Sequence, residues 1–73
     1  MIQFITFTIH ALDANYDILK FFNITMINYI ATSHHNDGYT EYHIQYGLLT
    51  ISQTSILLDF IMKNEFIENV KIV

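Results

Sequence analysis

Polar and apolar residues alternate from Ile5 to His10 near the start of the chain. The apolar set on one side of an extended backbone is Ile5, Phe7 and Ile9, and the polar set on the other side is Thr6, Thr8 and His10. A period of two residues, in a run rich in β-branched and aromatic side chains, predicts a β-strand with one buried face. We therefore expect a half-buried central strand from Ile2 to His10.

The apolar residues that follow recur at helical spacing. Tyr16, Leu19 and Phe22 would share one face of a helix. Asp13 can accept hydrogen bonds from the free N–H groups at the start of that helix. Asn23 tolerates the left-handed backbone that commonly ends one. The pattern predicts a helix between Asp13 and Asn23.

The segment from Ile24 to Ser33 fits two structures. Met26 and Ile30 would continue the helical stripe, whereas the β-branched and aromatic residues around them favour a strand. We interpret the segment as a strand. The Asp-Gly pair at positions 37 and 38 is typical of the turn in a β-hairpin.

The clearest alternation in the chain begins after this turn. One face would carry Tyr42, Ile44 and Tyr46, and the other would carry Glu41, His43 and Gln45. The alternation predicts a strand from Tyr39 to Tyr46. We interpret Gly47 as a bulge in a longer strand that continues through residues 48–52.

A second helix and a last strand complete the predicted elements. Thr54 or Ser55 can cap a helix that runs through the apolar residues from Ile56 to Ile61 and ends near Asn64. The β-branched residues of the segment 66–73 favour a final strand.

The order strand, helix, strand therefore occurs twice in one domain that covers residues 1–73. Two such halves joined by a hairpin, with right-handed crossovers, make an α+β fold of the ferredoxin-like split βαβ type (β-α-β-β-α-β). We expect a four-stranded antiparallel sheet with both helices on one face. An alternative arrangement extends the first helix to Thr32 and divides Tyr39 to Ser52 into a hairpin.

Composition excludes several classes of function. The chain of 73 residues is 52% hydrophobic and carries three lysines, no arginine, seven acidic residues and a formal net charge of -4. Nucleic-acid binding rests on clustered Lys and Arg, so we expect no direct nucleic-acid partner. The absence of cysteine excludes disulfides and thiolate chemistry. The apolar run Leu48–Met62 is interrupted by polar residues and is too short to cross a bilayer, so we expect no membrane partner.

Candidate catalytic and metal-binding residues are few. His34, His35 and Asp37 offer three ligands in four positions, but adjacent histidines on a loop seldom reach one ion, and we interpret this segment as an exposed turn. Glu41 and His43 share a strand face without a nucleophile motif or a phosphate-binding glycine loop. We expect no catalysis, no metal and no cofactor.

The aromatic residues indicate an interaction surface. Five tyrosines and six phenylalanines exceed what so small a core can bury, and exposed tyrosine is enriched at protein interfaces. We predict a small acidic protein-binding module whose acids meet a basic surface of the partner, while its tyrosines supply the buried contacts. The predicted partner-binding residues are Asp37, Tyr39, Glu41, Tyr42, His43 and Tyr46.

The bias toward Ile, Asn, Phe and Tyr is typical of AT-rich coding sequences, which phages, viruses and some bacteria share. It favours a phage- or virus-encoded inhibitor of a host protein, of the anti-defence or anti-CRISPR type, that acts in the host cytoplasm. The alternative is a homo-oligomeric regulatory domain that pairs sheets or edge strands and binds a small molecule at its interface. A homodimer is therefore among the expected assemblies.

Overall fold

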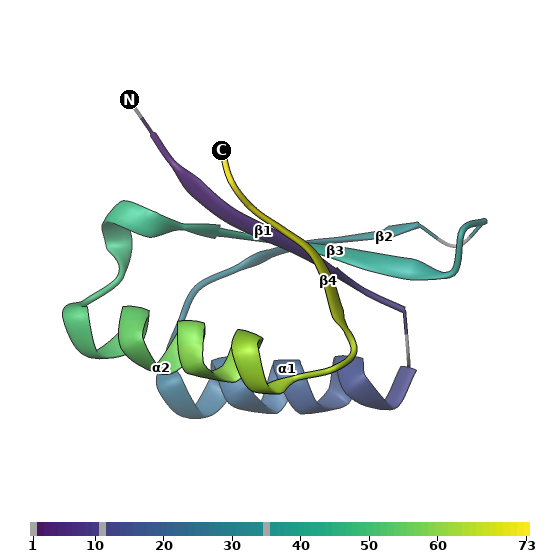
Figure 1. The fold of residues 1–73 in the computed structure, drawn as a ribbon, viewed down its shortest axis with the longest axis horizontal. Coiled ribbons are helices and arrows are strands. Elements are labelled where there is room, and N and C mark those ends of the chain that lie inside the picture. The colour runs from purple at the N-terminus through teal and green to yellow at the C-terminus, as the bar shows by residue number, and fades with distance from the viewer. Residues whose placement is uncertain (1, 11, 35) are drawn as a thin grey trace.

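The computed structural model describes residues 2–10, 12–34 and 36–73. Strands and helices follow one another as the hydrophobic pattern predicts (Figure 1). The strands are β1 (Phe4–Ile9), β2 (Ile30–His34), β3 (Tyr39–Gln45) and β4 (Ile67–Ile72), and the helices are α1 (Leu12–Thr25) and α2 (Ile51–Lys63). A short 3-10 turn, η1 (Tyr46–Leu48), connects β3 with the segment that leads into α2.

The four strands form one antiparallel sheet in the order β2-β3-β1-β4. Both helices lie on the same side of this sheet, and the opposite side carries neither (Figure 1). This arrangement is the ferredoxin-like split βαβ fold, and the predicted fold is confirmed. The sheet therefore has one face packed on helices and one face open.

The core lies between the sheet and the two helices. Its buried apolar residues are Ile5, Phe7, Ile9, Ala14, Ile18, Phe22, Ile27, Tyr42, Ile44, Leu57 and Ile61. Phe7 of β1 stacks on Tyr42 of β3 with ring centroids 5.5 Å apart. Phe21 of α1 stacks on Phe60 of α2 at 4.1 Å, so aromatic contacts also join the two helices.

The predicted polar face of β1 is less exposed than alternation suggests. Thr6 and Thr8 are only 8% and 6% exposed. β1 has a strand on either side, and Thr8 Oγ1 accepts a hydrogen bond from Asn69 Nδ2 at 3.1 Å. A strand in the middle of a narrow sheet is thus buried on both faces, although one of them is polar.

The first helix buries a different face from the predicted one. Its core residues are Ala14, Ile18 and Phe22, spaced four apart, whereas Tyr16 is 65% exposed and Leu19 is 37% exposed. The prediction is wrong for Tyr16 and Leu19 because the apolar stripe that reaches the core is formed by Ala14 and Ile18 together with Phe22. An alanine in the first turn still contributes to a core stripe because its small side chain is fully buried there.

The first helix also ends later than predicted. Met26, not Asn23, has a left-handed backbone, with φ of 59°. The Ile27 N–H donates to the Phe22 carbonyl at 3.2 Å, which is the longer hydrogen bond of a Schellman cap. Ile27 is 4% exposed, so its burial beside Phe22 offsets the cost of a left-handed methionine.

The extended first helix changes the segment predicted as a strand over residues 24–33. Ile24 and Thr25 belong to α1, residues 26–29 form a connection, and the strand begins only at Ile30. Both arrangements considered for this segment are therefore wrong in part. β-propensity alone did not determine the structure of this segment, because a helix that continues to Thr25 allows Ile27 to be buried.

The segment around Gly47 also differs from the prediction. β3 ends before Gly47, which lies in η1 rather than in a bulge of a longer strand. Thr50 caps α2: its Oγ1 accepts from the Gln53 N–H, and Gln53 Oε1 accepts from the Thr50 N–H, both at 3.0 Å. This capping box begins the helix one turn earlier than the predicted caps, Thr54 and Ser55.

The hairpin turn and the last strand form where the sequence places them. Gly38 has a φ of 73°, and the N–H groups of Asp37 and Gly38 both donate to the His34 carbonyl. β4 pairs with β1 but contains an irregularity beside Asn69, which has a φ of 56°. A bulge of this kind increases the local twist of an edge strand.

Candidate functional site

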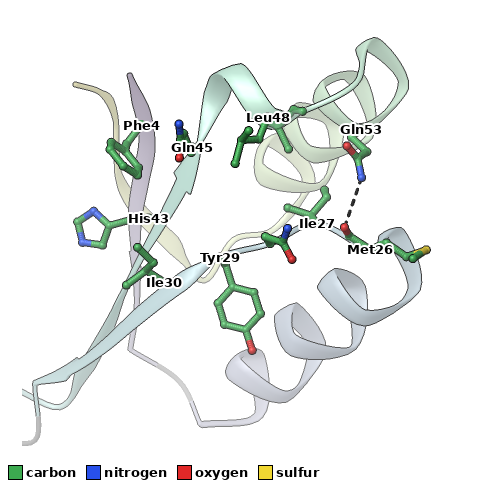
Figure 2. Close-up of a pocket in the computed structure, with 11 residues that line it drawn as sticks. Phe4, Met26, Ile27, Tyr29, Ile30, His43, Gln45, Leu48 and Gln53 are labelled. Atoms are coloured by element: carbon green, nitrogen blue, oxygen red, sulfur yellow. Dashed lines mark hydrogen bonds between the residues drawn. The ribbon is translucent and has the colours of Figure 1, made fainter. Parts of the chain in front are cut away.

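A pocket of about 240 Å³ opens where α1 ends and α2 begins (Figure 2). Four segments of the chain supply its walls. They are Phe4 in β1, residues 26–30 from the end of α1 to the start of β2, His43 and Gln45 in β3, and Leu48, Leu49 and Gln53 from η1 to the first turn of α2. The pocket therefore lies at one end of the sheet, at the loops that join sheet and helices.

Gln53 holds the two helices together beside this pocket. Its Nε2 donates to the carbonyl of Thr25 at 3.1 Å. It also donates to the carbonyl of Met26 at 3.5 Å, the bond that is dashed in Figure 2. These carbonyls belong to the end of α1, where backbone acceptors lack helical partners. Because the same side chain also caps α2 through Thr50, one residue fixes the end of one helix relative to the start of the other.

The walls of the pocket are uncharged. No Asp, Glu or Lys is among its lining residues, and the polar groups come from Asn28, Gln45, Gln53 and His43. The rim is apolar and open to solvent, since Met26, Ile30 and Leu48 are 82%, 60% and 66% exposed. Small-molecule pockets have volumes of roughly 300 to 1,000 Å³. The volume of this pocket lies below that range.

Three of the six predicted partner-binding residues lie together on the open face of the sheet. Glu41 Oε1 is 3.1 Å from His43 Nε2 and 3.8 Å from His34 Nε2. The ring of Tyr39 stacks on His34 with centroids 4.5 Å apart and contacts His10 at 5.3 Å. The sheet thus brings Tyr39, Glu41 and His43 into one row, extended by two histidines from the neighbouring strand β2 and the end of β1.

This row of side chains brings imidazole groups and one carboxylate together. The hydrogen bond between Glu41 and His43 forms when His43 Nε2 carries the proton. His34 Nε2 is buried and has no hydrogen-bond partner among the described residues. Within residues 2–10, 12–34 and 36–73, no group of three or more His, Asp or Glu side chains is placed to hold a metal ion. His35, one of the ligands considered above, lies outside the described residues.

Comparison with known proteins adds no relative. No family model matches the chain, and neither a curated protein nor a solved structure matches it.

Tyr42 has no surface to offer a partner. It is 2% exposed, and its hydroxyl donates to Asn15 Oδ1 at 2.6 Å. Burial, together with the nearby phenol of Tyr29, raises the pKa of Tyr42 to about 12. Tyr42 was included because it alternates with Tyr46, but the face they share is the one that packs on the helices. It is a core residue and leaves the candidate contact set.

The remaining two predicted residues lie apart from the row on the open face. Asp37 is exposed in the hairpin turn, and Tyr46 is 39% exposed in η1, beyond the other end of β3. The acidic residues are spread over both helices, two turns and two strands, and Asp59 pairs with Lys63 at 3.1 Å. The six predicted residues therefore do not make one continuous acidic contact surface.

The sequence pattern missed the pocket because its walls were assigned to strands. Met26 and Ile30 fell within the predicted strand 24–33, and Leu48 fell within the predicted continuation past Gly47. Their exposure follows from the late end of α1 and the early start of α2. The capping box at Thr50 and Gln53 was the one signal in the sequence that would have placed Leu48 in a loop.

The described residues include no helix long and apolar enough to cross a membrane. The longer helix, α1, has 14 residues and carries two acids and a lysine, whereas a membrane-spanning helix needs about 20 mostly apolar residues.

Proposed function

We propose that this chain is a small protein-binding module that receives an uncharged, apolar side chain of its partner in the pocket at the end of α1. The observation that carries the proposal is the pocket itself, with a volume of about 240 Å³ and no charged lining residue. Protein interfaces concentrate their binding energy in a few large side chains that enter dry pockets surrounded by less critical contacts. The exposed rim residues Met26, Ile30 and Leu48 would supply that surrounding ring.

The exposed apolar residues support a partner that is a protein rather than a small molecule. Leu48, on the pocket rim, is 66% exposed, and Ile51, the first residue of α2, is 92% exposed. Soluble monomers rarely expose contiguous apolar surface without using it. A small molecule buried in the pocket would leave this rim in water, whereas a protein surface would cover it.

A variant pair tests the proposal. Leu48→Glu puts a carboxylate on the pocket rim, and Leu58→Glu makes the same change on α2 at a residue that is 42% exposed and does not line the pocket. Neither change buries the new charge, so both variants keep the fold. A complex recovered from bacterial lysate with the tagged wild type should be lost with Leu48→Glu and kept with Leu58→Glu. Equal recovery with both variants would place the contact elsewhere.

A second measurement needs no knowledge of the partner. Titration with N-acetyl-leucinamide and N-acetyl-aspartamide, followed by NMR, should move the methyl signals of Met26 and Leu48 with the first compound and leave them in place with the second. Identical shifts with both compounds would contradict a selective apolar socket.

The narrower expectations rest on composition. That the partner belongs to a host defence system, that the chain comes from a phage or virus, and that it acts in the cytoplasm remain predictions. The acids would still speed association with a basic partner through the net charge of -4. Because the acidic residues are scattered, this electrostatic attraction would act at long range, and the apolar residues would make the contact itself.

A further inference from the structure

The two edges of the sheet are built differently. The outer strand β4 has a bulge beside Asn69 and carries Glu68 and Lys71. Bulges and charged residues are the devices by which sheet proteins prevent pairing at an open edge. The opposite outer strand, β2, has the sequence IATSH, with no acid, lysine or proline. Its register with β3 runs unbroken from the Ile30–His43 pair to the His34–Tyr39 pair.

The hydrogen-bond ladder shows which backbone groups of β2 point outward. The Tyr46 N–H donates to the Gln3 carbonyl at 3.0 Å, which continues the β1–β3 ladder. Hydrogen-bonded and non-hydrogen-bonded pairs alternate in an antiparallel ladder. In β3, residues 40, 42 and 44 therefore bond to β1, and residues 39, 41 and 43 bond to β2. Their partners 30, 32 and 34 are used, so Ala31 and Ser33 direct their N–H and C=O groups to the free edge.

These groups are self-complementary. If a second copy approaches antiparallel with a two-fold axis at Thr32, Ala31 of each copy lies opposite Ser33 of the other. Both residues present a donor and an acceptor to the edge, so the two pairs supply four hydrogen bonds between the chains. Thr32 would meet Thr32 of the second copy on the open face, a pairing that stabilises adjacent strands.

We propose that β2 pairs with β2 of a second copy of this chain, which joins the two sheets into one of eight strands. The interface is isologous, as in most homodimers. No charged residue lies in β2, so the net charge of -4 on each chain places no carboxylate between the paired strands. Glu41, the nearest acid of the sheet, is one strand further in and bonds to His43.

The helix above β2 leaves room for the second copy and offers it an apolar flank. Ala31 and Ser33 are exposed although they lie on the helix side of the sheet with Tyr42. Leu19 of α1 and Tyr29 line the same shallow depression and are 37% and 40% exposed. In Figure 1, α1 and β2 lie behind α2 and β4, on one side of the molecule. The same side therefore presents both a free edge and exposed apolar side chains.

The area of this side of the molecule limits the expected affinity of the dimer. The molecule measures 34 × 26 × 19 Å, and the side that carries β2 and α1 is bounded by the two longer dimensions. A stable interface buries roughly 800 Å² per partner, close to the most that such a side can supply. We therefore expect a dimer that forms and dissociates with concentration. The pairing strand begins at Ile30, which also lines the pocket, but it does not include Leu48, the rim residue changed in the test of the proposed function. The two proposals are therefore tested by different variants.

Sedimentation velocity over a range of concentrations tests the pairing. The mass of the wild type should rise from 8.6 kDa toward twice that value. Ser33→Pro removes an outward N–H from an edge strand, a position that tolerates proline. It should weaken dimerisation about tenfold or more. Ile72→Pro removes the equivalent N–H from β4, since the Val73 N–H already donates to Phe4, and should leave the dimer intact.

A second variant and a second measurement distinguish loss of the dimer from loss of the fold. Thr32→Lys sets two ammonium groups opposite each other at the axis and should give a folded monomer by circular dichroism. Hydrogen exchange of the Ala31 and Ser33 amides in the wild type should slow as concentration rises, with Ile72 unchanged. A wild type that stays at 8.6 kDa in millimolar solution would overturn the proposal. So would dissociation of the Ile72→Pro variant to the same extent as Ser33→Pro. A monomer whose Ala31 and Ser33 amides are protected only by an added strand peptide would assign the edge to a foreign strand instead.

Discussion

Removal of the Tyr42 hydroxyl should have an effect that depends on pH. The side chain is 2% exposed and donates a hydrogen bond of 2.6 Å to Asn15. Tyr42→Phe keeps the ring that stacks on Phe7 at 5.5 Å and removes only this hydrogen bond. A buried hydrogen bond contributes about 1 kcal/mol to the free energy of unfolding. For a chain of this length, a loss of 1 kcal/mol lowers the Tm by about 4 to 8 °C.

The sign of the pH effect follows from the two pKa values of Tyr42. The pKa is about 10 in the unfolded chain and about 12 in the folded protein. The stability that the neutral phenol contributes is therefore fully present below pH 10. It is lost as pH rises from 10 to 12, because the unfolded chain releases a proton that the folded chain retains. At pH 11 the loss is on the order of 1.4 kcal/mol.

Urea unfolding at pH 7 and pH 11, followed by circular dichroism, measures both effects. At pH 7 the Tyr42→Phe variant should be about 1 kcal/mol less stable than the wild type. At pH 11 the two proteins should be nearly equal, because only the wild type loses stability through Tyr42, and the other titrating groups are common to both. Tyr16→Phe, at a residue that is 65% exposed, should match the wild type at both pH values. An equal deficit of Tyr42→Phe at pH 7 and pH 11 would refute the description of a buried, hydrogen-bonded phenol.

Two further outcomes follow from the structure. Thr50→Ala removes the hydroxyl of the capping box and should lower the free energy of unfolding by about 1 kcal/mol. Ser55→Ala, at an exposed position inside α2, should change the free energy of unfolding by less than about 0.5 kcal/mol. Equal effects of the two variants in urea unfolding would contradict the position of the cap. Protonation of four histidines takes the formal net charge from -4 to 0. Solubility, measured by precipitation with polyethylene glycol, should therefore fall from pH 7.5 to pH 5.5, toward the pI of 5.3. An unchanged solubility would show that the formal charge misleads.

The sequence patterns that predicted the fold are those that are compatible with few types of secondary structure. The alternation over β1 and β3 gives a single apolar face only to an extended backbone, and the Asp-Gly pair between two β-rich runs favours a hairpin turn. Once two helices are placed between these strands, the right-handed crossover fixes the strand order. The sequence by itself therefore determined the class of fold, the number of strands and helices and the absence of charge in β2.

The ends of the helices depend on contacts between distant parts of the chain. α1 continues to Thr25 because Ile27 can be buried beside Phe22. The end of α1 is also held by Gln53, 27 residues after Met26, which donates to the Met26 carbonyl. Local propensity favoured a strand there, and the tertiary contacts prevailed. The same contacts turned Met26 and Ile30 outward and so created the rim of the pocket.

The candidate contact residues show the same division. Alternation placed Glu41 and His43 on one face of β3, and the structure confirms that they lie together, at 3.1 Å. The alternation alone could not show that the face with Tyr42 packs on the helices, or that Tyr46 lies beyond the strand in η1. A period of two residues separates two faces without saying which one is covered. Only the packing of α1 and α2 on one side of the sheet decided that, because burial is a property of what lies above a residue and not of the residue itself.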